Sequence, residues 1–376
     1  MSGWAIMGGV LAYVGHVATC VSLVNRMHST AVHYRLIKVC ELPVGLWLLG
    51  APLAAWQLRE NLIASILLSL YAFFCCLMLL KVFVEWLSRR LSGPPAALLS
   101  SSSELVNVAS LLDRSLAGNA VGRFCARLPG NQIFLLEITR KTLAVPRLPP
   151  ALAGLTIAHL SDLHFTGRIA REYFEYQVER TLQLQADMIV VTGDILDAWE
   201  CREWIPATLG RLQAPHGVYF LLGNHDLRPG HPTELRAQLV DAGLIDVGNQ
   251  VTRRMIRGTT VCLAGNELPW FSPAPDVSFE GVENEFPILL SHAPDQIDWA
   301  VQRRFPLMLA GHTHGGQIVF PVLGPVVAPS RYGVRYAGGV FQERGTVMHV
   351  SRGLSGEEPL RWNCPPELAL LTLAAT

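Results

Sequence analysis

Three long apolar segments alternate with short polar connections over the first quarter of the chain. They cover residues 3–24, 42–58 and 62–84. Lys81 is the one charged residue within them, and His16 is the one histidine. Because about 20 consecutive apolar residues cross a bilayer, we predict three transmembrane helices within residues 1–90. The second segment is short and contains Pro43 and Pro52, which leaves a re-entrant segment as the alternative.

From Leu155 onward, apolar runs of strand length alternate with stretches of helical pattern. The apolar runs occupy residues 155–160, 188–191, 218–222, 288–290 and 305–310, and the helical stretches include residues 171–185 and 233–242. Such alternation predicts a layered α/β domain. In domains of this kind the strands end at a shared edge, where ligands bind.

Residues 91–130 connect these two parts and are predicted to be a linker. Two segments rich in serine, proline and glycine, residues 92–95 and 100–103, indicate a flexible break. Residues 104–128 are loosely amphipathic, which predicts either a helix on the membrane surface or a connecting helix packed on the α/β domain. Residues 133–139 are then predicted to form an edge strand.

Composition and charge narrow the class of protein. The 376 residues are 50% hydrophobic and 16% charged, with a mean hydropathy of +0.31, which is too apolar for an ordinary soluble enzyme. The net charge is zero, so nothing favours a nucleic-acid partner. The eight cysteines form no Cys-x-x-Cys pair, which indicates reduced thiols and argues against a zinc ribbon or thiol catalysis.

The basic residues beside the apolar segments predict an orientation in the membrane. Arg26, Arg35 and Lys38 follow the first segment, Arg59 alone follows the second, and Arg89 and Arg90 follow the third. Positively charged connections face the cytoplasm. Three spans therefore place the N-terminus outside and the α/β domain in the cytoplasm.

Each apolar run of the predicted α/β domain is followed at once by residues that can bind a metal ion. They are Asp162, His164, Asp194, Asp197, Asn224, His225, Asp226, His292, His312 and His314. One such residue alone is usually a turn or cap residue. Five strand ends carrying oxygen and nitrogen ligands in register predict a metal centre for manganese, iron or zinc.

This ordered set of motifs resembles the calcineurin-like metallophosphoesterase superfamily. The likeness spans residues 131–376, and the closing segment 361–368 resembles the bacterial branch with membrane-linked phosphodiesterases. The resemblance implies a four-layer α/β-β/α sandwich and two divalent metal ions, with manganese favoured. The apolar residues 1–90 have no counterpart in the superfamily core.

The resemblance also implies roles for individual residues. Asp194 is expected to bridge the two ions, with Asp162, His164 and His314 completing one site and Asn224, His292 and His312 the other. His225 is expected to protonate or stabilise the leaving oxygen. Asp197 either orients His225 or serves as a turn residue, and Asp226 is expected to be a structural hydrogen-bond acceptor.

Four arginines follow the last ligands, namely Arg331, Arg335, Arg352 and Arg361. Planar guanidinium groups there either grip a second phosphate or a carboxylate of the substrate or are ordinary surface residues. The leading hypothesis is a phosphoesterase anchored in the bacterial inner membrane and acting on a lipid or lipid-linked phosphodiester or pyrophosphate. The chain is similar to the UDP-2,3-diacylglucosamine pyrophosphatases of lipid A synthesis. The alternatives are a phosphodiesterase for soluble nucleotides or cyclic substrates, and a non-catalytic membrane scaffold.

Overall fold

A computed structural model of the chain describes residues 3–278 and 285–376. The chain divides into two compact units. The first comprises Met1–Pro94 and Pro329–Gly333, and the second comprises Pro95–Ala328 and Val334–Thr376. The boundary falls within the serine- and proline-containing segment that the sequence indicates as a break.

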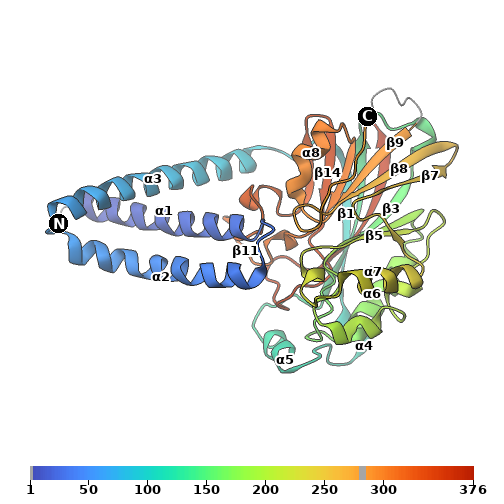
Figure 1. The fold of residues 1–376 in the computed structure, drawn as a ribbon, viewed down its shortest axis with the longest axis horizontal. Coiled ribbons are helices and arrows are strands. Elements are labelled where there is room, and N and C mark those ends of the chain that lie inside the picture. The colour runs from blue at the N-terminus through green and yellow to red at the C-terminus, as the bar shows by residue number, and fades with distance from the viewer. Residues whose placement is uncertain (1–2, 279–284) are drawn as a thin grey trace. The chain divides into compact units, whose positions relative to one another are not determined.

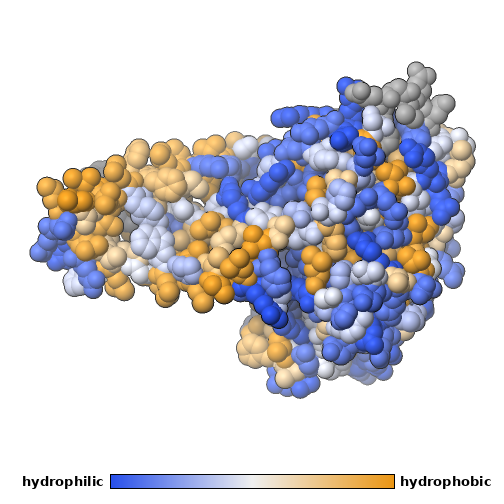
Figure 2. Space-filling view, viewed as in Figure 1, coloured by the Kyte–Doolittle hydropathy of each residue, from blue (hydrophilic) through white to orange (hydrophobic). Residues whose placement is uncertain are grey.

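The first unit contains three long helices, α1 (Gly3–Met27), α2 (Tyr34–Leu58) and α3 (Leu62–Leu91), each long and apolar enough to cross a membrane. Helix α2 begins before the predicted apolar segment and continues through Pro43 and Pro52, so a broken re-entrant segment is not observed there. Apolar side chains dominate the surface of this unit in Figure 2. A soluble protein rarely leaves such a surface to water, which supports a lipid environment for these helices.

The second unit is built on two β-sheets that pack face to face (Figure 1). The seven-stranded sheet has the order β1-β2-β15-β3-β4-β5-β6, and the six-stranded sheet has the order β13-β14-β10-β9-β8-β7. The strands of the first sheet are β1 (Leu98–Asn107), β2 (Leu135–Val145), β15 (Glu367–Ala375), β3 (Thr156–Leu160), β4 (Met188–Thr192), β5 (Val218–Leu221) and β6 (Ile245–Asp246). Those of the second are β13 (Gly339–Glu343), β14 (Thr346–Val350), β10 (Leu307–Ala310), β9 (Glu285–Ser291), β8 (Thr259–Asn266) and β7 (Val251–Ile256).

Apolar side chains fill the space between the two sheets and cover their outer faces. Residues from both sheets, including Val190 and Leu309, form the inner core. Helices α6 (Arg171–Gln183) and α7 (Pro232–Asp241) pack through Phe174 and Leu235 against the outer face of the seven-stranded sheet. Helix α8 (Ile297–Gln302) contacts β14 of the other sheet. The predicted layered α/β fold is therefore confirmed.

The segment between the two predicted domains differs from the expected linker. Residues 98–107 form β1, which pairs antiparallel with β2, and short helices α4 (Val108–Leu112) and α5 (Ala120–Ala126) follow. The prediction of one amphipathic helix over residues 104–128 is wrong, and β2 is an interior strand instead of an edge strand. An edge strand with solvent-facing side chains tolerates the serine run, because its stability comes from the backbone ladder to β2.

Parallel pairing brings the site loops together. β3, β4 and β5 are parallel neighbours in one sheet, and β8, β9 and β10 are parallel neighbours in the other. The loops that follow β3, β4, β5, β9 and β10 carry the predicted ligands. Their common position at the carboxyl ends of the strands assembles one site from five separate stretches of sequence.

Candidate metal centre

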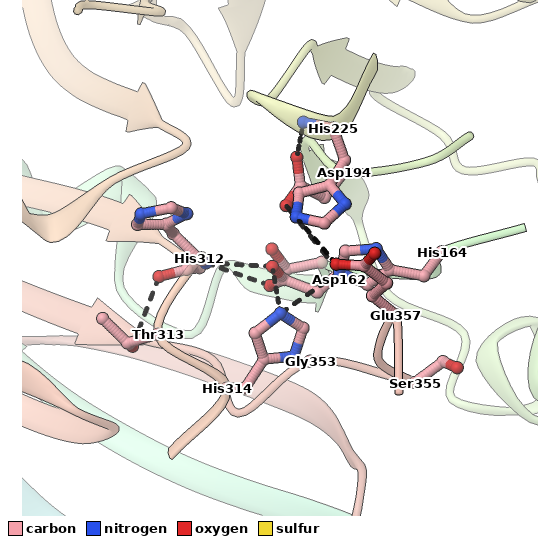
Figure 3. A network of polar contacts seen from close by, with 12 residues as sticks. Asp162, His164, Asp194, His225, His312, Thr313, His314, Gly353, Ser355 and Glu357 are labelled. Atoms are coloured by element: carbon pink, nitrogen blue, oxygen red, sulfur yellow. Dashed lines mark hydrogen bonds and ion pairs between the residues drawn. The ribbon is translucent and has the colours of Figure 1, made fainter. Parts of the chain in front are cut away.

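The predicted ligands lie in two adjoining groups that share one carboxylate. Figure 3 shows five of them, namely Asp162, His164, Asp194, His312 and His314. The ligand atoms of Asp162, His164, Asp194 and His314 lie within 4.8 Å of one another, as do those of Asp194, His292 and His312. Asn224 joins the second group, with its Oδ1 3.1 Å from His292 Nε2. This is the division expected from the resemblance, with Asp194 at the junction.

Five of the seven predicted ligands have a left-handed backbone. Their φ angles are 53° at Asp162, 50° at His164, 54° at Asp194, 72° at His312 and 53° at His314. This conformation is uncommon for residues other than glycine and costs on the order of 1 kcal/mol or more at each position. Strain repeated at these positions indicates that the surrounding fold holds the loops in shape for the side chains they present.

Two glycines leave room for the carboxylates. A Cβ atom at Gly223 would lie 2.2 Å from Asp194 Oδ1, and one at Gly311 would lie 2.5 Å from Asp162 Oδ2. Any larger residue at either position would displace a carboxylate. The glycines of the Gly-Asn-His-Asp and Gly-His-x-His motifs are therefore required by close packing against the ligands.

Backbone N–H groups orient both carboxylates. The His225 N–H donates to Asp194 Oδ1 at 2.8 Å, and the His312 N–H lies 3.1 Å from each oxygen of Asp162. Asp194 Oδ2 is buried and has no hydrogen-bond donor among the described residues, although His292 Nε2 lies 3.2 Å away. A buried carboxylate oxygen that lacks a hydrogen-bond donor is suited to bind a cation.

The histidine nitrogens also converge as metal ligands do. His164 Nε2 lies 3.1 Å from His314 Nε2, and His292 Nε2 lies 3.1 Å from His312 Nδ1. The other nitrogens of two rings are held from behind, because His164 Nδ1 donates to Asp197 Oδ2 at 2.8 Å and His292 Nδ1 donates to the Thr192 carbonyl at 2.7 Å. This support fixes the tautomer that presents Nε2 to the site. The residues therefore fit divalent metal ions bound by nitrogen and oxygen.

Electrostatics within the site favour charged forms. Burial lowers the pKa of His164 and His292, but the carboxylates of Asp197 and Asp194 outweigh it and raise each pKa to about 9. Burial opposes ionisation of Asp194 and Asp197, yet the neighbouring histidines hold the pKa of both carboxyls well below the ordinary range. The rings therefore carry protons that a bound cation displaces.

His225 lies beside the two ligand groups and is held by Asp197. Its Nδ1 donates to Asp197 Oδ1 at 2.5 Å, and its Nε2 is 4.0 Å from Asp194 Oδ2. Its ring stands at 86° to that of His164, with 4.5 Å between the ring centroids. Asp197 therefore supports one predicted ligand and the predicted acid at the same time.

Asp226 clamps the two loops that carry Asp194 and Asn224. Its Oδ1 accepts from the Ile195 and Leu196 N–H groups at 2.9 and 2.8 Å, and its Oδ2 accepts from the Gly223 N–H at 2.8 Å. Burial and the charge of Asp194 raise its pKa to about 7. The structural role expected for Asp226 matches this geometry.

The four predicted substrate arginines do not form one cluster. Arg361 is fully buried and donates to the His314 carbonyl at 2.8 Å and to His314 Nδ1 at 3.1 Å, so it supports a ligand and does not contact substrate. Arg352 pairs with Glu137 at 2.7 Å and with Glu367 at 3.2 Å, and Arg335 pairs with Glu343 at 2.6 Å. A substrate role is thus wrong for Arg361, and Arg335 and Arg352 are held in ion pairs with carboxylates. Arg331 belongs to Pro329–Gly333, which groups with the first unit.

Two residues beside the site, Arg228 and Glu357, were missed from the sequence. Arg228 lies 2.8 Å from Glu357 and 3.6 Å from Asp197, and Glu357 Oε2 lies 4.0 Å from His225 Nε2. The Trp270 ring lies 4.8 Å from that of His312. Arg228 had a signal, because it follows the Gly-Asn-His-Asp motif by two residues. Glu357 had none, because only the fold brings its segment to the site. Trp270 belongs to an aromatic cluster with Trp199, Trp204 and Phe271, which the sequence predicts either to line a groove for acyl chains or to be ordinary core.

The fold and the two ligand groups define a metal-dependent phosphoester hydrolase, and comparisons with known proteins agree. The family described as calcineurin-like phosphoesterase matches residues 155–316, which contain all the predicted ligands. The uncharacterized metallophosphoesterase YkuE of Bacillus subtilis is 31% identical over 250 residues, 64% of this chain and 87% of that protein. The chain belongs to the calcineurin-like phosphoesterases.

Two further relatives bear on the membrane and on the reaction. A bovine (Bos taurus) transmembrane protein with metallophosphoesterase domain is 30% identical over 257 residues, 63% of this chain and 57% of that protein. Phosphodiesterase YaeI of Escherichia coli is 28% identical over 229 residues, 59% of this chain and 83% of that protein. The likeness thus extends to a relative named for its transmembrane region and to one named for phosphodiester hydrolysis.

Proposed function

We propose that this protein is a membrane-anchored phosphodiesterase or pyrophosphatase with two metal ions, acting on a lipid or lipid-linked substrate. The observation that carries the proposal is the presence, on one chain, of three helices of bilayer-crossing length and a metallophosphoesterase domain. Only residues 92–97 separate α3 from β1. A site tied this closely to a bilayer meets substrates embedded in it far more often than dissolved ones.

Asp162, His164, Asp194 and His314 would hold one ion, and Asp194, Asn224, His292 and His312 the other. Bound divalent ions, with manganese favoured, supply positive charge at the phosphate and raise the nucleophilic strength of water at neutral pH. The chain's own residues orient these ligands through Asp197, Thr192 and Arg361.

His225 is the group that donates a proton to the leaving oxygen. Its Nε2 is the nitrogen turned away from Asp197, so this atom carries the transferable proton while Asp197 holds the ring in place. Arg228 and Glu357 lie beside His225 and would contact the part of the substrate that departs. This arrangement suits an alkoxide or phosphate leaving group that needs protonation.

The distribution of Lys and Arg supports a cytoplasmic catalytic domain with the N-terminus outside, and we propose a bacterial inner membrane as its location. A lipid pyrophosphate such as UDP-2,3-diacylglucosamine fits such a location, because the nucleotide lies in the cytoplasm and the acyl chains lie in the bilayer. Hydrolysis of that substrate releases UMP and a lipid monophosphate.

The test is product release by the full-length protein in detergent, with manganese, zinc and magnesium compared. The substrates are UDP-2,3-diacylglucosamine, a diacyl phospholipid, a cyclic nucleotide and bis(4-nitrophenyl) phosphate. We expect the acylated pyrophosphate or phospholipid to give the highest kcat/KM. A cyclic nucleotide as the best substrate would establish the soluble alternative, and inactivity on every substrate with both ions bound would favour a scaffold.

A further inference from the structure

An uncharged stretch follows the last metal-binding histidine directly, and its residues 315–328 belong to the second unit. Residues 315–330 contain no Asp, Glu, Lys, Arg or His. Within them, β11 (Val319–Phe320) and β12 (Gly324–Pro325) pair antiparallel. Residues 318–327 are called the apolar hairpin below. Its Phe320, Leu323 and Val327 are 42%, 61% and 52% exposed.

Trp362 extends the apolar hairpin into a fixed surface. The Val319 N–H donates to the Trp362 carbonyl at 2.9 Å, and the Trp362 N–H donates to the Gln317 carbonyl at 2.9 Å. The Phe320 and Trp362 rings meet edge to face with 5.8 Å between centroids. Trp362 is itself 37% exposed. Backbone bonds on both sides thus hold the exposed apolar side chains in place.

The apolar hairpin is also joined to the metal centre. A Cβ atom at Gly316 would lie 2.6 Å from Pro325 Cβ, so the hairpin packs on the loop that ends at the last ligand. Arg361, the neighbour of Trp362, donates to His314 at its carbonyl and at Nδ1. The same two stretches of chain therefore carry the exposed apolar surface and one of the metal-binding histidines.

Exposed apolar side chains on consecutive residues mark an interaction surface, because water penalises them. The partner that this surface fits is a lipid bilayer. Residues 92–97 connect α3 to β1 and span at most about 25 Å when fully extended, so β1 stays close to any membrane that α3 crosses. Aromatic residues such as Phe320 and Trp362 suit the boundary between headgroups and acyl chains. The absence of charge over residues 315–330 removes the main cost of entering that boundary.

We propose that the apolar hairpin, together with Trp362, inserts into the lipid surface and holds the metal centre at the depth of the phosphate groups. An enzyme held at this depth would hydrolyse phosphoesters that reside in a membrane in preference to dissolved ones. The inference rests on the proposed function in one respect, namely that α1, α2 and α3 cross a bilayer.

The direct test measures the depth of a spin label in the full-length protein, reconstituted in nanodiscs of phosphatidylcholine and phosphatidylglycerol. The label is placed by Leu323→Cys, and Cys40 and Cys76 are replaced by serine because neither is fully buried. Met255→Cys is the matched control, since Met255 is an apolar residue 67% exposed on β7. We expect the Leu323 label to collide with oxygen dissolved in lipid, and the Met255 label with an aqueous nickel chelate. Equal nickel accessibility at both positions overturns the proposal.

A second variant links the surface to turnover. Leu323→Asp should lower the rate on a phospholipid diester in vesicles about tenfold or more and leave hydrolysis of bis(4-nitrophenyl) phosphate unchanged, because Leu323 has no part in the metal centre. If the variant and the wild type hydrolyse the vesicle substrate at equal rates, the apolar hairpin does not hold the metal centre at the membrane. If the wild type cleaves no lipid substrate while the Leu323 label lies in lipid, the proposed substrate class fails and the membrane surface stands.

Discussion

The second unit contains two clusters of buried histidines, and they differ in whether the carboxylates beside the rings have all their hydrogen-bond partners within the protein. Between the sheets, His159 Nδ1 lies 2.9 Å from His349 Nδ1, and the remaining nitrogens reach Thr192 Oγ1 at 2.9 Å and Lys141 Nζ at 3.0 Å. Glu367 completes the cluster with a 2.5 Å ion pair to Lys141. All four ring nitrogens of this closed cluster have partners within the protein.

The metal centre is the open cluster. His164, His292 and His314 are also buried, and their Nε2 atoms converge on one another and on the carboxylates of Asp162 and Asp194. Asp194 Oδ2 has no hydrogen-bond partner among the described residues. Burial alone therefore does not separate a structural histidine from a ligand. What separates them is whether the arrangement can be completed without an added cation.

The largest expected effect comes from removing the carboxylate shared by both ligand groups. Asp194→Ala should abolish turnover and remove most bound metal, because two cations would then face each other without shared compensation. Elemental analysis and activity of the purified variant measure this. Two metal equivalents with intact activity would contradict the bridging assignment. Asp187→Ala, which removes a carboxylate at the start of β4 outside the site, serves as the control.

His225→Ala should keep both metals and lower kcat by about 10² to 10⁴, because it removes a positioned proton donor without removing a ligand. The loss should be smaller for a nitrophenol leaving group, which departs without a proton. Steady-state kinetics on a nitrophenyl and an alkyl diester distinguish the outcomes. An equal loss on both substrates would exclude His225 as the acid, and loss of metal would place it among the ligands.

Asp226→Asn tests the support beneath the open cluster. The substitution replaces a carboxylate oxygen, which accepts a hydrogen bond from a backbone N–H group, by an amide NH₂ group that cannot accept one. The free energy of unfolding should therefore fall by about 1–3 kcal/mol. Metal affinity should fall as well, because the loops of Asp194 and Asn224 lose their common clamp. Urea unfolding and metal titration measure both. Asp241→Asn, an exposed residue at the end of α7, should change neither quantity.

The smallest effect concerns pH and the closed cluster. Burial lowers the pKa of His159 to about 3 and that of His349 well below its ordinary value. Below about pH 6.5 the unfolded chain binds protons that the folded chain does not, so folding stability falls as pH drops from 6.5 towards 3. The slope is at most about 1.4 kcal/mol per pH unit for each ring.

Replacing both rings should flatten that dependence. The metal-free His159→Leu/His349→Leu variant should lose less stability between pH 7 and pH 5 than the metal-free wild type does. Urea midpoints at the two pH values measure the difference. A variant whose midpoints move as far as those of the wild type would show that the two histidines are not neutral in the folded protein.

The open cluster could be predicted from the sequence because every ligand directly follows an apolar run that forms a strand. Each strand fixes where its ligand lies, and the parallel pairing of the strands brings the ligands to one edge of the sheet, as with Asp162 after β3 and Asp194 after β4. The closed cluster could not be predicted, because His159 and His349 lie within strands of different sheets and meet only through sheet packing.

The remaining errors have a similar cause. The sequence predicts Arg361 either as a substrate contact or as a surface residue, and neither matches, because its partner, the loop of His314, lies 47 residues earlier and is reached only when the tail folds back. The strand β1 was missed because its serines carry no hydrophobic alternation, while its stability comes from pairing with β2. Local patterns show what a segment contributes by itself and not what a distant segment completes.

The position of β15 has a consequence for biosynthesis. This strand lies between β2 and β3, so the β1–β2 pair and the β3–β6 sheet remain separate until residues beyond Glu367 have been made. The ribosome delivers the apolar helices first. The catalytic domain therefore completes its sheet, and places Arg361 against His314, only after α1, α2 and α3 have had time to enter a membrane. The three apolar helices are thus complete before the ligands of the metal centre can be held together.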